Sequence, residues 1–323
     1  MKNVALLIHD DVVLSTVAGP MDMFIHTNRY LQQEGEGPFF NIVLVGDKPY
    51  TEHANIPVCY AEYKCYTDLP RPDLIIVPAF YGSPDVILKK HGSLIEWLKH
   101  MHNQGAELAS LCSGSYFLAE TGLLNGKACT SHWRDMPDLN SRFPAVEFHS
   151  GMVITDQEGI YTSGGAFSSL NLILYLFEKY CGKEIGVWAS KMFSLDIDRV
   201  SQSHFAIFQG QRTHKDEGIL RAQTFIEKYY QDEISIDDIA GQANMSKRNF
   251  IRRFKTATQN TPIEYLQRVK IEVAKKALEK NEQNVSSLMY EAGYNDIKAF
   301  RKVFKRYTGL TPQDYRRKYS RAV

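Results

Sequence analysis

The 323-residue chain has no long apolar run, because none approaches the roughly 18 residues that a membrane span requires. Its first apolar stretch, Met1 to Ile8, ends at His9 and two aspartates, which makes it too short for a signal peptide. No small-residue cleavage site follows this stretch. The sequence therefore predicts a cytoplasmic protein with no membrane partner, in which the stretch forms a first β-strand.

Cysteine is scarce, and its positions do not suggest a shared role. The five cysteines are odd in number and scattered, with no Cys-x-x-Cys pair, and the ten histidines show no spacing typical of metal ligands. This pattern predicts reduced thiols, as in a cytosolic protein, with no disulfide framework, no metal site and no cofactor. The cysteines are Cys59, Cys65, Cys112, Cys129 and Cys181.

Net charge is also small, at +1, but it is divided unevenly along the chain. Residues 216–323 contain 21 Lys and Arg against 14 Asp and Glu, a net charge of +7, so the preceding residues carry −6. A basic last third favours a nucleic-acid partner for that part of the chain. A solvated basic surface without a partner is the alternative that charge alone leaves open.

The front of the chain alternates apolar, β-rich runs with helical patterns. Continuous apolar strands separated by helices predict a parallel sheet covered by helices on both faces, an α/β domain of flavodoxin-like architecture. Helices are expected over Asp85–His102 and Phe167–Tyr180. The expected strands are Asn3–Ile8, Asn41–Gly46, Asp73–Ala79 and Glu107–Cys112, with shorter ones near Lys127–His132, Met152–Thr155 and Gly159–Ser163.

From about Asp216 the strand signals end, and a 3.6-residue periodicity predicts an all-α domain. The stretch just before it is rich in Gln, Ser, His and Arg, a composition that we interpret as a linker. We therefore expect a front domain over residues 1–198, a linker over 199–215 and a helical domain over 216–323.

The helical part repeats itself at an offset of 50 residues. Two copies predict a duplicated supersecondary unit rather than a solenoid, which needs more repeats. In each copy a short helix, a turn and a second helix follow one another, as in a helix-turn-helix. The matching pairs include Phe250 and Phe300, Phe254 and Phe304, Thr261 and Thr311, and Tyr265 and Tyr315.

Capping residues mark where these helices begin and end. Ser235 is the expected N-cap of the first short helix, and Ser246 that of the helix after the turn. Thr261-Pro262-Ile263-Glu264 has the pattern of a capping box and predicts a connecting helix that ends near Glu279. Gly293 suits the left-handed position at the turn of the second copy.

A rotation of 100° per residue places Phe250 and Phe254 on the buried face of their helix, and Phe300 and Phe304 on that of theirs. The opposite faces are basic. Arginine and lysine there can reach guanine in the major groove, and flanking residues can hold phosphates, although any exposed helix carries such residues. The expected DNA-contact residues are Lys247, Arg248, Asn249, Arg252, Lys298, Arg301 and Lys302.

This last third resembles the DNA-binding domain of the AraC family. The resemblance rests on Phe250-x-x-x-Phe254-Lys255, on Ala292-Gly293-Tyr294 and on the closing run from Gly309 to Arg316. Gln259-Asn260 stands where the family usually has a glycine, and we expect the asparagine to take the left-handed conformation. The resemblance implies promoter or operator DNA as partner, more often activation than repression, and RNA polymerase as a partner if the protein is an activator.

We also expect a homodimer, since pairing adds affinity through effective concentration.

In the front part, Leu111-Cys112-Ser113-Gly114-Ser115 ends an expected strand and opens an apolar helix. A sharp turn there would lift the Cys112 thiol over the sheet at a helix N-terminus, the geometry of a nucleophile elbow. His132 follows a later expected strand and could approach Cys112, the minimum for nucleophilic catalysis or for stabilising a thiolate. A half-buried thiol with an unrelated histidine is the alternative.

Five short runs of the front part form a shared pattern: Ala18–Phe24, Asp73–Pro78, Leu111–Gly114, Thr130–Trp133 and Thr162–Gly165. On these runs, residues 1–190 resemble the ThiJ/PfpI-like, class I glutamine amidotransferase-like fold. Joined to the AraC-like tail, they resemble the GlxA family of transcription regulators over nearly the whole chain. Relatives usually carry Asp or Glu four residues before Pro20, where this chain has Thr16, so the resemblance implies a ligand-binding or vestigial site without catalytic residues. Its candidate residues are Cys112, His132, Thr16 and Asp22, and its implied ligand is a small nitrogenous metabolite.

Three hypotheses about function follow from these patterns. The leading one is a sequence-specific DNA-binding transcription regulator, not an enzyme, whose front domain senses a metabolite or dimerises. The second is a cysteine-dependent hydrolase or amidase with a DNA-binding appendage. The third is a scaffold whose front domain serves only to dimerise.

Overall fold

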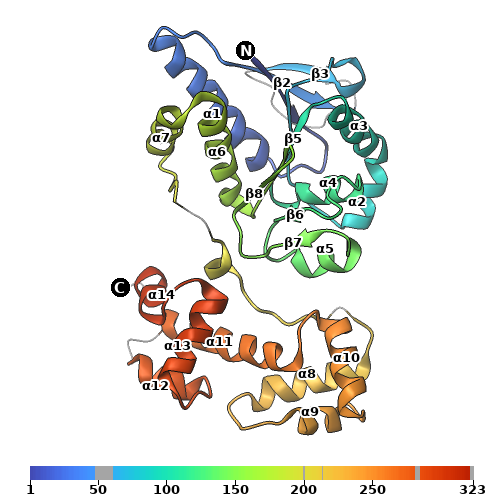
Figure 1. Cartoon of the computed structure of the whole chain (residues 1–323), viewed down its shortest axis with the longest axis vertical. Coiled ribbons are helices and arrows are strands. Elements are labelled where there is room, and N and C mark those ends of the chain that lie inside the picture. The colour runs from blue at the N-terminus through green and yellow to red at the C-terminus, as the bar shows by residue number, and fades with distance from the viewer. Residues whose placement is uncertain (48–60, 199–200, 213, 281–283, 321–323) are drawn as a thin grey trace. The chain divides into compact units, whose positions relative to one another are not determined.

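A computed structural model describes the whole chain except residues 48–60, 199–200, 213, 281–283 and 321–323. The chain divides into two compact units, Met1–Gln202 and Ser203–Val323 (Figure 1). The expected limits of front domain, linker and helical domain stay a prediction. Within the described residues, no helix has the length and apolar character needed to cross a membrane.

A seven-stranded sheet forms the centre of the first unit, in the order β3-β2-β1-β4-β5-β9-β8. Neighbouring strands are parallel except β8 and β9, which form an antiparallel hairpin. Without the two edge strands the order is that of the flavodoxin-like architecture. The strands are β1 (Lys2–Leu7), β2 (Phe40–Gly46), β3 (Glu62–Cys65), β4 (Leu74–Val77), β5 (Glu107–Ser110), β8 (Ile154–Gln157) and β9 (Ile160–Ser163).

Helices cover both faces of this sheet (Figure 1). Successive side chains of a strand point to opposite faces, so in β1 Ala5 and Leu7 enter one core while Val4 and Leu6 enter the other. The continuous apolar runs of the sequence are explained by these two cores, and the expected α/β fold is confirmed. One core is covered by α2 (Pro84–Lys90), α3 (Gly92–Asn103) and α4 (Ser115–Glu120), the other by α1 (Ser15–Gln33), α6 (Ser169–Cys181) and α7 (Lys183–Met192).

Two expected elements differ in the structure. The single helix expected over Asp85–His102 is interrupted at His91, whose backbone leaves the helical conformation (φ −104°, ψ 27°) while its side chain is buried. The strand expected near Lys127–His132 shrinks to β6 (Ala128–Cys129), which pairs with β7 (Glu147–Phe148) in a separate two-stranded sheet. Beyond β6 the backbone amide of Thr130 bonds to a side chain instead of a strand. The short helix α5 (Met136–Arg142) lies between β6 and β7.

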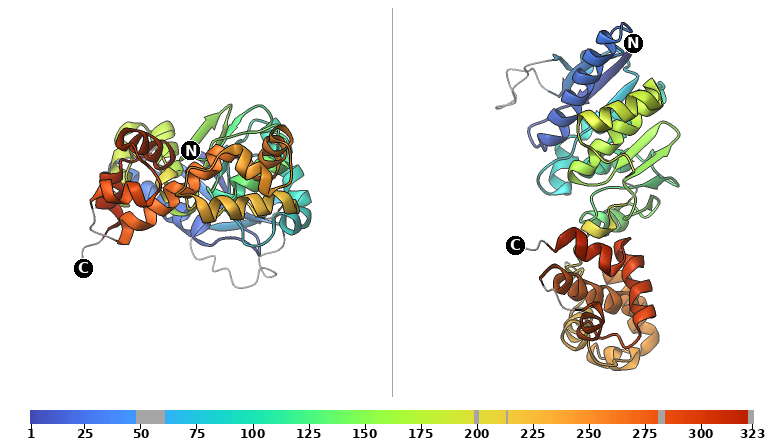
Figure 2. Two further views of the ribbon diagram at one scale, coloured as in Figure 1. Left: turned by 90° about the horizontal axis from the view of Figure 1, so that it is seen from below. Right: turned by 90° about the vertical axis from the view of Figure 1, so that its left-hand side faces the viewer.

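The described part of the second unit contains helices and connecting segments (Figure 2). It begins with a short 3-10 turn, η5 (Ser203–Phe205). The all-α fold expected for the tail is confirmed. The helices are α8 (Glu217–Tyr229), α9 (Ile236–Gln242), α10 (Lys247–Thr258), α11 (Pro262–Lys280), α12 (Val285–Glu291), α13 (Ile297–Thr308) and α14 (Pro312–Tyr319).

The sequence repeat is also a structural repeat, because each copy builds its own core around the same aromatic residues. In the first core the rings of Phe250 and Phe254 lie 5.3 Å apart, and Tyr265 lies 5.4 Å from Phe254. In the second, the equivalent ring separations are 5.7 and 5.5 Å. All four phenylalanines are fully buried. The prediction that they face inward is therefore confirmed.

The expected N-caps are confirmed at two of the three helix starts. Ser235 and Asp238 form a reciprocal capping box at the start of α9. Thr261 and Glu264 form the same arrangement at the start of α11, with the Thr261 amide donating to the glutamate over 2.8 Å. Ser246 occupies the N-cap position of α10, but its side chain caps no backbone amide among the residues that the structure describes.

The left-handed residue after α10 is not the one expected. Gln259, not Asn260, has the positive φ angle (57°), and Gly309 takes the same position after α13 (φ 75°). Asn260 instead uses its side-chain amide to donate to the Thr258 carbonyl at 2.6 Å. A glutamine in this conformation is strained because its Cβ crowds the backbone, whereas glycine is not.

We predict that Gln259→Gly stabilises the second unit by about 0.5–1 kcal/mol, since relief of strain exceeds the added freedom of the unfolded chain. The matched change in the other copy, Gly309→Gln, should destabilise by a similar amount. Thermal unfolding followed by the helical circular dichroism signal measures both changes. A lower midpoint for Gln259→Gly would show that the glutamine is not strained.

Candidate DNA-binding helices and the Cys112 turn

The basic residues expected to contact DNA on α10 lie on its exposed face. Arg248 and Arg252 are exposed one turn apart, opposite the buried phenylalanines. Asn249 lies beside them, and its side-chain oxygen accepts a hydrogen bond from Arg252 at 2.9 Å. Lys247, at the first turn, pairs with Asp237 at 2.8 Å, and both side chains are exposed. An exposed pair of this kind is weak, so Lys247 is readily released to a phosphate.

Arg253, the next residue along α10, has a structural role. Its guanidinium donates two hydrogen bonds of 2.9 Å to the Asp216 carboxylate, which also caps the start of α8. Although partial burial raises the pKa of Asp216, the bonds from Arg253 outweigh it and hold that pKa below its ordinary value. This bidentate pair fixes α10 against α8 and turns Arg253 away from the exposed basic face.

The second copy presents the same pattern on α13. Lys298, Arg301 and Lys302 are exposed, while Phe300 and Phe304 are buried. Asp296 caps the helix by accepting a hydrogen bond from the Lys298 amide at 2.8 Å. Two helices therefore expose basic residues at matching positions. Contact of these residues with DNA stays a prediction.

One helix belongs to both copies. The first half of α11 contributes Tyr265 and Val269 to the first core, and its second half contributes Ile271, Ala274 and Leu278 to the second. A helix of this length spans roughly 28 Å at 1.5 Å per residue. Because α11 is continuous, it joins α10 and α13 through a rigid element rather than a flexible loop.

The turn at Cys112 has the sharp geometry expected from the sequence. Cys112 lies two residues after the end of β5, it has a positive φ angle of 55°, and its side chain is partly exposed. The Ser113 hydroxyl hydrogen-bonds with both the amide and the carbonyl of Phe80, at 3.0 and 3.3 Å. A side chain at Gly114 would lie 2.4 Å from the Val77 carbonyl oxygen, so only glycine fits. These contacts with the segment after β4 hold Cys112 in its strained conformation.

Thr16, at the position where the resemblance implies an acid, is a structural residue. It is almost fully buried, its hydroxyl donates to the Val13 carbonyl at 2.7 Å, and it accepts from the Ala79 amide at 3.0 Å. Thr16 therefore supports the same segment that holds the Cys112 turn. Asp22, the other acid considered, is exposed on α1.

His132 lies on a segment that contacts the Cys112 turn. The hydroxyl of its neighbour Ser131 donates to the Cys112 carbonyl at 2.8 Å. The His132 ring packs directly over Gly165, where a Cβ would lie only 2.0 Å from the ring. Burial lowers the pKa of His132, so the ring is neutral near pH 7. Its Nδ1 accepts the Arg134 amide at 3.1 Å, which places the proton on Nε2 and leaves no free basic nitrogen.

Gln202 connects the segments around this turn, and sequence reasoning missed it. It is 1% exposed, and its amide donates to the carbonyls of Ser131 and Met152 at 2.8 and 3.0 Å. Its side-chain oxygen accepts from the Gly165 amide at 3.3 Å. Gln202 is the last residue of the first unit, so the chain leaves that unit directly from the surroundings of His132. No local pattern marks a glutamine whose partners lie 37 to 71 residues away.

Two family models match the chain. The model of the DJ-1/PfpI family matches residues 2–179, more than half of the sequence. The chain belongs to the DJ-1/PfpI family. A second model, described as a helix-turn-helix domain, matches residues 239–318, which include α10 and α13. This DJ-1/PfpI domain is thus joined to an AraC-type helix-turn-helix domain, and the expected resemblance is confirmed.

Curated relatives of this DJ-1/PfpI-family chain are named as regulators. The HTH-type transcriptional regulator GbdR of Pseudomonas aeruginosa is 25% identical over 251 residues, 76% of this chain and 66% of GbdR. The HTH-type transcriptional regulator GlxA of Rhizobium meliloti is 21% identical over 224 residues, 68% of each protein. The match thus spans about two thirds of each relative. A solved structure, an AraC family transcriptional regulator from Pseudomonas putida, shares the fold, with a TM-score of 0.50 at 16% identity, covering 60% of this chain and all of that one.

We predict that Thr16→Val destabilises the DJ-1/PfpI unit by about 1–3 kcal/mol, because the buried Ala79 amide loses its acceptor while the side-chain shape is kept. Thr16→Ser retains the hydroxyl and should cost much less. Urea unfolding followed by tryptophan fluorescence reports this unit alone, since Trp97, Trp133 and Trp188 all lie within it. Equal stability of Thr16→Val and the wild type would contradict a supporting role for the hydroxyl.

Proposed function

We propose that the protein is a sequence-specific DNA-binding transcription regulator. The observation that carries this proposal is the duplicated helix-turn-helix, in which α10 and α13 expose basic residues at equivalent positions and share the rigid helix α11. Matching exposed residues on two copies favour a repeated ligand, and DNA repeats its grooves every helical turn. The regulator names of the relatives support the same function.

The bases are read from α10 and α13, with Arg248, Arg252, Lys298 and Lys302 facing the major groove. Lys247, Asn249 and Arg301 flank them and hold phosphates. Double-stranded promoter or operator DNA is the partner, RNA polymerase is a further partner if the protein activates, and a homodimer adds a second pair of reading helices. The cytoplasm is where a regulator of this kind meets its DNA.

The DJ-1/PfpI unit senses a small metabolite rather than catalysing a reaction. A hydrolase needs a base beside the thiol, but the Nδ1 of His132 is already occupied and Thr16 supplies no carboxylate. The strained, partly exposed Cys112 is suited to contact a ligand at the carboxyl ends of the parallel strands. Gln202 hydrogen-bonds with Ser131 and Gly165 and directly precedes the second unit. A ligand that moves the segments of Ser131 and Gly165 therefore also moves Gln202, where the chain leaves the first unit.

We predict that Arg248→Ala combined with Arg252→Ala weakens binding to DNA selected by the wild-type protein. Each base contact is worth about 1–3 kcal/mol, so the loss should be at least about tenfold. The matched control is Lys276→Ala with Lys280→Ala, which removes two exposed charges one turn apart on α11. Binding is measured at fixed salt, because charge alone makes affinity depend on salt. Equal losses in both double variants would mean that the basic surface binds without reading sequence.

For the sensing unit, we predict that one compound in a panel of small nitrogenous metabolites raises the midpoint of the tryptophan-monitored thermal transition. A ligand at a hundred times its Kd stabilises by about 2.7 kcal/mol. Cys112→Ala should abolish the shift, whereas Cys181→Ala, at another partly exposed cysteine, should retain it. A panel in which no compound shifts the midpoint would favour a front unit that only dimerises.

A further inference from the structure

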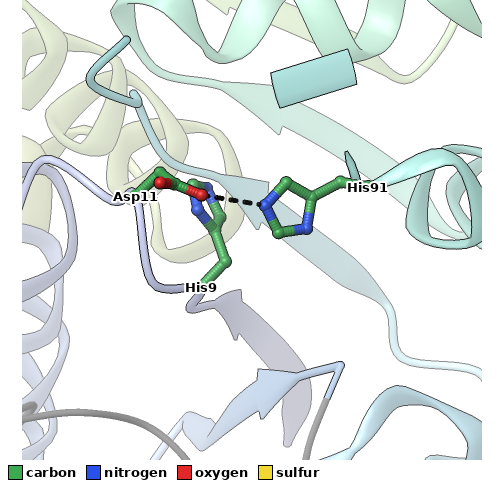
Figure 3. Close-up of side chains that lie close together, drawn as sticks. All are labelled: His9, Asp11 and His91. Atoms are coloured by element: carbon green, nitrogen blue, oxygen red, sulfur yellow. Dashed lines mark hydrogen bonds and ion pairs between the residues drawn. The ribbon is translucent and has the colours of Figure 1, made fainter. Parts of the chain in front are cut away.

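A second cluster of polar side chains lies at the carboxyl end of β1 (Figure 3). His9 and Asp11 follow this strand, and His91 reaches the same place from the junction of α2 and α3. One ligand-type atom from each residue lies within 4.8 Å of the others. β1 is flanked by β2 and β4, the point where the strand order reverses direction, and sheets of this type bind ligands there.

His9 is the most unusual member of the cluster. Its side chain is 1% exposed, yet neither ring nitrogen has a hydrogen-bond partner among the residues that the structure describes. A neutral imidazole has one ring nitrogen with a free lone pair, and that nitrogen can bind a metal ion. A buried polar group without a partner is costly, and a bond to a metal ion would satisfy it.

The ring of His91 lies between two carboxylates. The His91 Nε2 lies 3.3 Å from Asp11 Oδ2, and its Nδ1 lies 3.4 Å from Asp47 Oδ2. The two carboxylates concentrate negative charge around a buried ring. A bound cation would add positive charge there. Lys90 supplies part of this charge, since its Nζ lies 2.7 Å from Asp11 and 3.7 Å from Asp10.

We propose that His9, Asp11 and His91 bind a divalent transition-metal ion of the zinc type. Two imidazoles and one carboxylate are a ligand set that zinc accepts, with a further position left for water or a small ligand. Ligand atoms of a tetrahedral zinc ion are roughly 3.3 Å apart, so the cluster must contract. Asp11 can make this movement because its side chain is 28% exposed, whereas both rings are buried.

The sequence hides this site because its ligands are far apart in the chain. His9 and Asp11 are separated from His91 by 80 residues or more, and no short motif joins them. The expectation of no metal site rests on local spacing, which cannot detect residues that only the sheet and the α2–α3 junction bring together. The site involves neither Cys112 nor the DNA-binding helices, so it does not depend on the proposed function.

Isothermal titration of the full chain with Zn²⁺, after treatment with a chelator, tests the proposal. His9→Phe keeps a ring against Phe117, 5.7 Å away in the native protein, and should weaken binding at least about tenfold. Asp11→Asn should do the same with little change of shape. Lys90→Met should tighten binding, because it removes the cation that competes for Asp11. His100→Ala, an exposed histidine outside the cluster, is the control and should leave affinity unchanged.

The spectrum of bound Co²⁺ separates this site from binding at a thiol. The proposed ligands give ligand-field bands without the charge-transfer band of a thiolate, and Cys112→Ser should leave the spectrum unchanged. Tryptophan fluorescence confirms that each variant is folded. Failure of the wild type to bind Zn²⁺, binding that survives His9→Phe, or a thiolate band lost in Cys112→Ser would each overturn the proposal.

Discussion

The continuous helix α11 is the constraint on which the arrangement of the second unit depends. Val269 and Ile271 are two residues apart, yet they belong to different cores, so neither copy can move without the backbone that the other packs on. The same helix also holds the start of the unit. Glu272 and Lys275 form a buried pair on α11, with Glu272 accepting the Phe208 amide and Lys275 donating to the Ala206 carbonyl. The segment that enters this unit is therefore attached to the helix that joins α10 and α13.

In the first unit, packing and hydrogen bonds hold the sharp turn at Cys112 in shape. The Cys112 turn depends on tight packing at Gly114 and on the bridge from Ser113 to Phe80, and neither requires a reactive thiol. At the position where the resemblance implies an acid, Thr16 uses its hydroxyl to hold the neighbouring segment. Packing and backbone hydrogen bonds thus hold the geometry that places the Cys112 side chain over the sheet.

Sequence patterns predicted what depends on local periodicity and repetition. In β1, successive side chains enter the two cores in turn, as the period of a strand requires. The inward phenylalanines and the capping boxes at Ser235 and Thr261 follow from spacing within one or two helical turns. The interruption at His91 and the short edge strand β3 were not predicted, because tertiary contacts decide them.

The residues of the candidate sites also divide into those that local spacing predicts and those that tertiary contacts decide. Arg248 and Lys298 are exposed as helical geometry requires, since that geometry is local. Gln202 and the cluster of His9 with His91 depend on partners far along the chain, and no pattern in a single sequence reveals them. Gln259 was missed for a different reason, since a resemblance identified the turn but the geometry of this chain decided which residue is left-handed.

Reading of DNA by two linked helices is the central claim, and selection of bound fragments from genomic DNA by the purified full-length protein tests it most directly. At fixed salt, the account predicts a defined motif with two sub-sites about one helical turn, roughly 34 Å, apart. Only diffuse binding that weakens with salt, without a shared motif, would contradict it and would reduce the second unit to a basic surface.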